Sequence, residues 1–194
     1  MNIYAWSLVL AVFALLSGCG TPSIHPLASE DTTVRDPALV GTWAKADAGK
    51  DEAIYRIEES GDHYTLTVEH RESDAPEKWV FEVKLVELGK YRFVDVQAAE
   101  PDRKSVDKRW ASFFVPTHLF GRYAIEGGTL KFWMLNQQWL EKSLSEQKFR
   151  LAHTSLDHDW VLITAETADL QAFLRAHAED SGAFDRTDLM KIKP

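Results

Sequence analysis

The residues best placed for chemistry lie at the end of an apolar leader. Cys19 is the only cysteine of the chain, and it directly follows Leu16-Ser17-Gly18. Residues 1–18 carry no charged side chain, and their apolar core over residues 8–16 is too short for a membrane-spanning helix of ~20 residues. A thiol in this position suits an enzyme that attaches lipid to sulfur and then cleaves the chain. The sequence therefore predicts a signal peptide over residues 1–18 and lipidation of Cys19.

The segment Leu16-Ser17-Gly18-Cys19 resembles the lipobox of bacterial lipoproteins, which reads Leu, a small residue, Gly or Ala, then Cys. All four positions match, although Met1-Asn2-Ile3 lacks the Lys or Arg usual at the start of such leaders. The resemblance implies that Cys19 becomes the first mature residue, bearing a diacylglyceryl thioether and usually a further acyl chain, such as palmitate, on its amine. Two or three chains hold a protein on a membrane where one alone binds marginally. Gly20, in place of Asp, favours the outer membrane, with the protein facing the periplasm.

The composition of the remaining chain predicts one acidic domain on a tether. The formal net charge of −8 argues against nucleic acid as a partner. Residues 19–37 hold the lipidated cysteine and a segment rich in Thr, Pro, Ser and charged residues, which predicts a flexible tether. Residues 38–194 suffice for a single folded domain. After lipidation of Cys19 no thiol remains for a disulfide, so the domain must depend on its core.

Period-two alternation of apolar and polar residues dominates that domain. Tyr55 and Ile57 alternate with Arg56 and Glu58 before a turn at Gly61, which is typical of a β-hairpin. Helical spacing replaces this alternation in a short segment after Asn136 and again over residues 168–180. We expect a mainly β fold, an antiparallel barrel of about nine strands with two short helices, the second near the C-terminus.

The start of the first clear strand, Gly41-Thr42-Trp43, resembles the Gly-x-Trp opening of lipocalins. In that family the tryptophan plugs the closed end of a β-barrel, and a late helix packs on the outside. The resemblance implies a lipocalin-like barrel with Trp43 at its base. Lipocalins usually contain disulfides, which this chain lacks.

Large aromatic side chains are candidates for the wall of a pocket inside this barrel. They either line a site for a small apolar or lipidic ligand or fill a small barrel completely. Neighbouring residues of a strand point to opposite faces, so Phe132 is predicted to point inward with Leu130 and Met134, and Trp133 outward. The candidate ligand-binding residues are Trp79, Phe81, Tyr91, Phe93 and Phe132.

The remaining polar motifs do not predict catalysis or metal binding. His118 lies between strands, where pairing with an aspartate would make it a base, but the sequence holds no Gly-x-Ser-x-Gly motif and no nucleophilic cysteine. His153, His158 and the aspartates beside His158 are best interpreted as a solvated turn. We expect no enzyme, no metal and no cofactor. The two functional hypotheses are a membrane-anchored module that binds an apolar ligand and an accessory lipoprotein with a packed interior that contacts another envelope protein.

Overall fold

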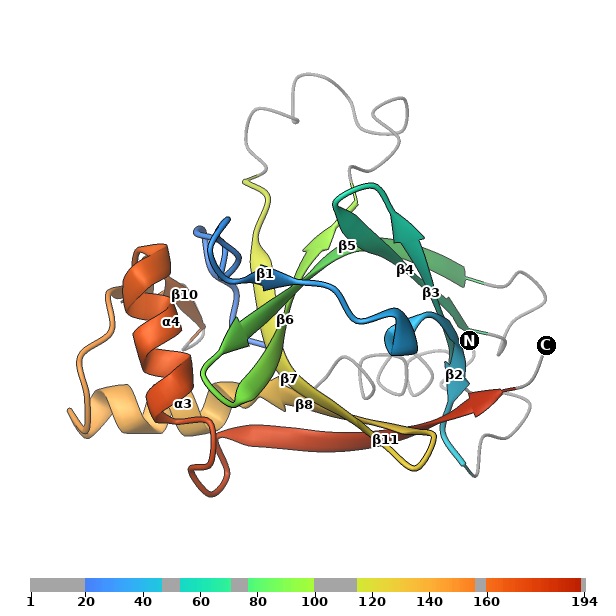
Figure 1. Ribbon diagram of the computed structural model, residues 1–194. Helices are drawn as coiled ribbons and strands as arrows, with labels where there is room; N and C mark the ends of the chain where they lie inside the picture. Colours follow the sequence, from blue (N-terminus) through green and yellow to red (C-terminus); the bar gives the residue numbers. More distant parts are fainter. Residues whose placement is uncertain (1–19, 47–52, 71–76, 100–114, 156–159, 193–194) are drawn as a thin grey trace, which may run out of the picture.

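The protein is a β-barrel with two helices on one side (Figure 1). The computed structural model describes residues 20–46, 53–70, 77–99, 115–155 and 160–192. The strands are β1 (Thr33–Val34), β2 (Gly41–Ala44), β3 (Ile54–Ser60), β4 (His63–His70), β5 (Glu77–Leu88), β6 (Tyr91–Ala98), β7 (His118–Glu126), β8 (Thr129–Leu135), β9 (His153–Ser155), β10 (Val161–Ile163) and β11 (Phe184–Ile192). The helices are the 3-10 turn η1 (Pro37–Leu39), α3 (Gln137–Ser145) and α4 (Thr167–Ala176).

Nine strands form one antiparallel sheet in the order β1-β5-β4-β3-β2-β11-β8-β7-β6, and a further pairing of β5 with β6 closes it. The length of β5 makes closure possible: its residues 77–83 pair with β4 and its residues 81–88 pair with β6. The short strand β1 pairs with β5 at Leu85 and Val86, on the same edge of β5 that pairs with β4. The prediction of an antiparallel barrel with about nine strands and two helices is confirmed: eight strands close the barrel, and β1 is added to it.

Up-and-down connectivity gives the barrel two different ends. Short turns join β3 to β4, β5 to β6 and β7 to β8 at the end that we call the turn end. At the last of these turns, Gly127 and Gly128 take φ values of 57° and 83°, which suits a tight hairpin. The longer connections from β2 to β3, β4 to β5 and β6 to β7 leave the opposite end, which we call the loop end.

The turn end is blocked by η1 and Trp43. The segment from β1 to β2 runs across this end of the barrel (Figure 1). Trp43 is 1% exposed, and its indole N–H donates to the Leu39 carbonyl oxygen at 2.9 Å. Asp36 caps η1 and accepts hydrogen bonds from Arg92 at 2.7 Å and from the Tyr123 hydroxyl at 3.3 Å. Burial, followed by the Asp36 charge, raises the pKa of Tyr123, so the phenol stays neutral and donates.

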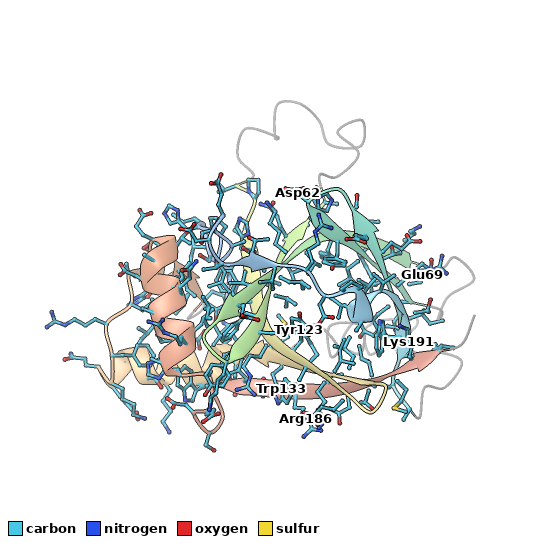
Figure 2. All side chains as sticks on the ribbon, viewed as in Figure 1. Asp62, Glu69, Tyr123, Trp133, Arg186 and Lys191 are labelled. Atoms are coloured by element: carbon cyan, nitrogen blue, oxygen red, sulfur yellow. The ribbon has the colours of Figure 1, made fainter. Side chains whose placement is uncertain are left out.

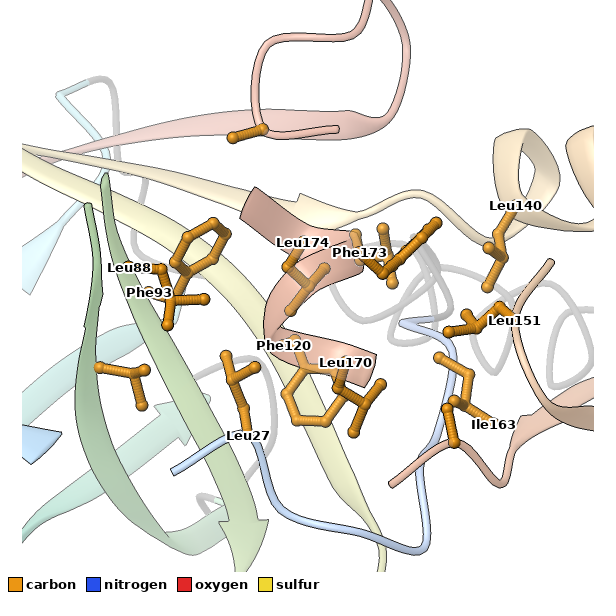
Figure 3. Packing of buried hydrophobic residues seen from close by; sticks show 14 of the residues in the cluster. Leu27, Leu88, Phe93, Phe120, Leu140, Leu151, Ile163, Leu170, Phe173 and Leu174 are labelled. Atoms are coloured by element: carbon orange, nitrogen blue, oxygen red, sulfur yellow. The ribbon is translucent and has the colours of Figure 1, made fainter. Parts of the chain in front are cut away.

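A second hydrophobic core lies outside the barrel, under α3 and α4 (Figure 3). Leu170, Phe173 and Leu174 follow helical spacing on α4 and belong to the same buried cluster as Phe93 and Phe120 of the barrel wall. Helical spacing therefore predicted the buried face of α4 correctly. The outer core under these helices buries Phe93 of β6 and Phe120 of β7, so part of the outer face of those strands is apolar as well.

The helix starts depend on different contacts. Asn136 caps α3 by accepting the Trp139 backbone N–H at 2.7 Å. In α4, Glu166 occupies the cap position without a side-chain bond, and Thr167 is the first helical residue. The Thr167 hydroxyl instead donates to the Pro26 carbonyl at 2.7 Å and fastens α4 to the N-terminal segment.

The prediction of a flexible tether over residues 19–37 is wrong for the described residues 20–37. Thr21 and Ser23 are 0% exposed, and Leu27 enters the outer core. Ser23 exchanges backbone hydrogen bonds with His118 at 2.9 Å in both directions. The polar composition misled the prediction because backbone hydrogen bonds and one inserted leucine, rather than an apolar stripe, hold this segment. The folded domain therefore includes Gly20 and does not begin at residue 38. Residues 1–19, with Cys19, lie outside the described residues.

Candidate ligand-binding cavity

The barrel encloses an apolar cavity of about 200 Å³. Its wall is built from inward-facing side chains of β3 to β8 and β11, with Leu39 of η1 at the turn end. The cavity extends from there toward the loop end, where His70, Trp79 and Leu119 line it. Because its walls are mostly aliphatic and aromatic, the cavity suits an apolar guest.

Few polar groups face this space. Among the described residues, the polar side chains on the wall are those of Tyr55, His70, Tyr123 and Thr187. The Tyr123 hydroxyl is committed to Asp36 at the turn end. His70, the last residue of β4, places an imidazole on the wall at the loop end. A ligand with an apolar part inside the barrel and a polar group near the loop end fits this distribution.

Three predicted residues, Trp79, Phe81 and Phe132, lie on the cavity wall. Phe132 points inward and Trp133 outward, as strand alternation predicts. The Trp133 ring lies between two guanidinium groups, those of Arg122 at 4.9 Å and Arg186 at 5.6 Å from its centroid. Figure 2 labels Trp133 and Arg186 on the outer side of the barrel and Tyr123 within it. Trp133 thus belongs to a cation–π stack on the surface.

The placement of Tyr91 and Phe93 in the pocket is wrong. Both face outward on β6: Phe93 is fully buried in the core under α4, and the Tyr91 ring packs on it edge to face at 6.4 Å. Val94 and Val96, on the other face of β6, line the cavity instead. Alternation could not choose between these faces because the outer helices bury one and the cavity the other. Val94 and Val96 are spaced two residues apart and lie on the face of β6 opposite to Phe93. This spacing is the sequence signal that could have identified them.

Gly121 makes room for the Phe132 ring on the cavity wall. A Cβ atom built on Gly121 would lie 2.8 Å from Cζ of Phe132 and 2.9 Å from the carbonyl oxygen of Trp133. A residue with a side chain at position 121 of β7 would not let the Phe132 ring lie this close to the backbone. The sequence did not identify Gly121 as a site residue. A glycine in a strand indicates that some group comes close to the backbone, but it does not show which group.

His118 does pair with an aspartate, but outside the cavity. Its Nδ1 lies 2.6 Å from Oδ1 of Asp95, and its Nε2 lies 3.4 Å from the amide nitrogen of Gln97. The other Asp95 oxygen accepts the backbone N–H groups of Leu27 at 2.7 Å and Ala28 at 3.0 Å. The pair therefore fastens the N-terminal segment to β6 and β7, and these contacts account for it as a structural element.

The remaining histidine motifs are separate from the cavity. The His153 ring nitrogen Nδ1 lies 2.7 Å from the Leu151 carbonyl oxygen, while His158 and its neighbouring aspartates fall outside the described residues. Within the described parts of the chain, no three His, Cys, Asp or Glu side chains are placed to hold a metal ion. No helix in those parts is long and apolar enough to cross a membrane.

No family model matches the chain, and neither the curated proteins nor the solved structures contain a significant match.

Proposed function

We propose that this protein is a membrane-anchored envelope lipoprotein whose barrel binds a small apolar or lipidic ligand. The observation that carries the proposal is the apolar cavity, closed at the turn end by Trp43 and lined toward the loop end by Trp79 and Leu119. A barrel that served only as a rigid scaffold would gain stability by filling this space, since an unfilled apolar cavity is destabilising. The cavity therefore favours the binding hypothesis over an accessory lipoprotein with a packed interior.

The anchor in this proposal is Cys19, lipidated as the lipobox resemblance implies. Gly20 after it favours the outer membrane, with the barrel in the periplasm. The partners of the protein are then the membrane, through its acyl chains, and an apolar ligand. Catalysis is not part of the proposal, because the Asp95–His118 pair is engaged with Gln97 and the N-terminal backbone.

Binding is tested on protein extracted from cells without its signal peptide and stripped of lipid. N-phenyl-1-naphthylamine, an apolar fluorophore, is expected to bind saturably with one site per protein and to be displaced by a long-chain fatty acid. Native mass spectrometry before delipidation is expected to show a co-purified apolar molecule. A folded, delipidated protein that binds the fluorophore only non-saturably would support the accessory hypothesis instead.

Lipidation is tested separately with a Cys19→Ser variant. Because Cys19 is the only thiol, the variant is expected to remain an unprocessed precursor without acyl chains. Metabolic labelling with a palmitate analogue should mark the wild type and leave the variant unmarked. Label on the variant, or none on the wild type, contradicts the anchor.

A further inference from the structure

The residue that follows the proposed lipidation site forms part of the cavity wall. Gly20 forms an isolated bridge with Asn136, directly after the last residue of β8, and so lies at the loop end. A Cβ atom on Gly20 would lie 2.8 Å from Cε of Met134 and 3.3 Å from Cδ2 of Leu119, and both of these side chains line the cavity. One peptide unit, about 3.8 Å between Cα atoms, separates Gly20 from Cys19.

The chain after Gly20 provides no slack between this point and the barrel. Pro22 accepts the Ile163 backbone N–H at 2.8 Å, and Ile24 donates to the Ile163 carbonyl at 3.1 Å. Ser23 is paired with His118 on its other side. An acyl anchor on the preceding residue is therefore attached to the rigid body of the barrel at its loop end, and it restricts how the barrel stands on a membrane.

Exposed apolar side chains lie near the same end. Trp160 is 44% exposed and precedes β10, which runs parallel to the N-terminal segment through the Ser23–Ile163 bridge, so Trp160 lies toward Gly20. Val115 is 66% exposed and precedes His118, the first residue of β7. Tryptophan is favoured at the interface between lipid and water. At the turn end, Asp62 is exposed on the β3–β4 turn (Figure 2), and Met190 and Ile192 of β11 are partly exposed there.

We infer that the loop end of the barrel faces the lipid leaflet that holds Cys19, and that the cavity takes up an acyl chain of a membrane phospholipid directly from that leaflet. The inference rests on the proposed lipidation and ligand class, and it adds the orientation and the source of the ligand. Contact between the loop end and the leaflet spares the acyl chain a passage through water, whose cost grows with every CH₂ group. The polar headgroup would remain near His70 and the interface.

The orientation can be measured with the full lipidated protein in vesicles of phosphatidylethanolamine and phosphatidylglycerol. Since lipidation consumes Cys19, a cysteine introduced elsewhere is the only free thiol and can carry a bimane label. Lys78→Cys places the label on an exposed residue at the loop end, and Asp62→Cys places it on the β3–β4 turn. A nitroxide phospholipid in the bilayer is expected to quench the Lys78→Cys label several-fold more than the Asp62→Cys label. Equal quenching, or stronger quenching at residue 62, overturns the orientation.

A linker variant provides the matched control. Insertion of a Gly/Ser linker of about ten residues between Cys19 and Gly20 is expected to abolish most of the quenching difference while the protein still floats with vesicles. It is also expected to slow transfer of a fluorescent phospholipid from vesicles into the barrel, with binding of N-phenyl-1-naphthylamine unchanged. Transfer at the wild-type rate by the linker variant overturns direct uptake. If the wild type does not float with vesicles, the anchor is absent and the inference fails with it. If the wild type floats and binds the probe saturably, but the label at residue 62 is quenched more than the label at residue 78, only the orientation is wrong and the proposed function stands.

Discussion

Replacement of Trp43 by alanine is expected to lower the free energy of unfolding by about 3–5 kcal/mol. The indole is 1% exposed and belongs to the barrel's interior cluster with Leu39 and Leu85. Its removal opens a void at the turn end and leaves the Leu39 carbonyl without its indole donor. Because η1 rests on this ring, the loss also loosens the element that closes the barrel.

Urea unfolding followed by circular dichroism measures this effect. Trp160→Ala is the matched control, because that tryptophan is 44% exposed, and its midpoint is expected to move far less. Gly41→Val should also destabilise, since Gly41 has a φ of 146° that a branched side chain rarely adopts. A Trp43→Ala midpoint equal to that of the wild type would contradict the role of Trp43 as a plug.

Replacement of Phe132 by glutamine is expected to weaken binding of N-phenyl-1-naphthylamine by about tenfold, which corresponds to ~1.4 kcal/mol. The substitution places an amide in an apolar wall, where it lacks partners of its own, and removes the aromatic surface opposite Gly121. The loss should appear as a higher Kd at an unchanged number of sites.

Trp133→Gln is the control at the adjacent position of β8. Its side chain faces outward between Arg122 and Arg186, so probe affinity is expected to stay near that of the wild type. Thermal unfolding of both variants confirms that each is folded at the temperature of the titration. Equal weakening by the two substitutions would show that probe binding does not depend on the cavity wall.

The difference between Phe132 and Phe93 shows when local sequence patterns can predict the orientation of a side chain and when they cannot. Both are aromatic residues in alternating strands, and the sequence proposes both for the pocket. For Phe132 the choice was correct because Lys131 and Trp133 share the less apolar face of β8, which marks the outer surface. For Phe93 it failed because α4, more than 70 residues later in the chain, covers the outer face of β6 and buries it as fully as the cavity buries Val94.

The charged residues in the first half of β11 make this strand hard to recognise from the sequence. β11 begins at Phe184, although three of the next four residues are charged. Arg186 and Asp188 form an ion pair on the exposed outer face, where charge is tolerated. The strand exists because β8 and β2 offer it backbone hydrogen bonds on both edges.

The sequence by itself determined the features that depend on neighbouring residues. Alternation specified the hairpins, helical spacing specified the buried face of α4, and the side chains flanking Phe132 specified its orientation. Only the tertiary structure decided which apolar face of β6 meets the cavity, that Asp95 holds both His118 and the backbone of Leu27, and that Gly20 lies on the cavity wall. Such contacts join residues far apart in the chain, and their energy exists only after the barrel has closed, so no local pattern carries them.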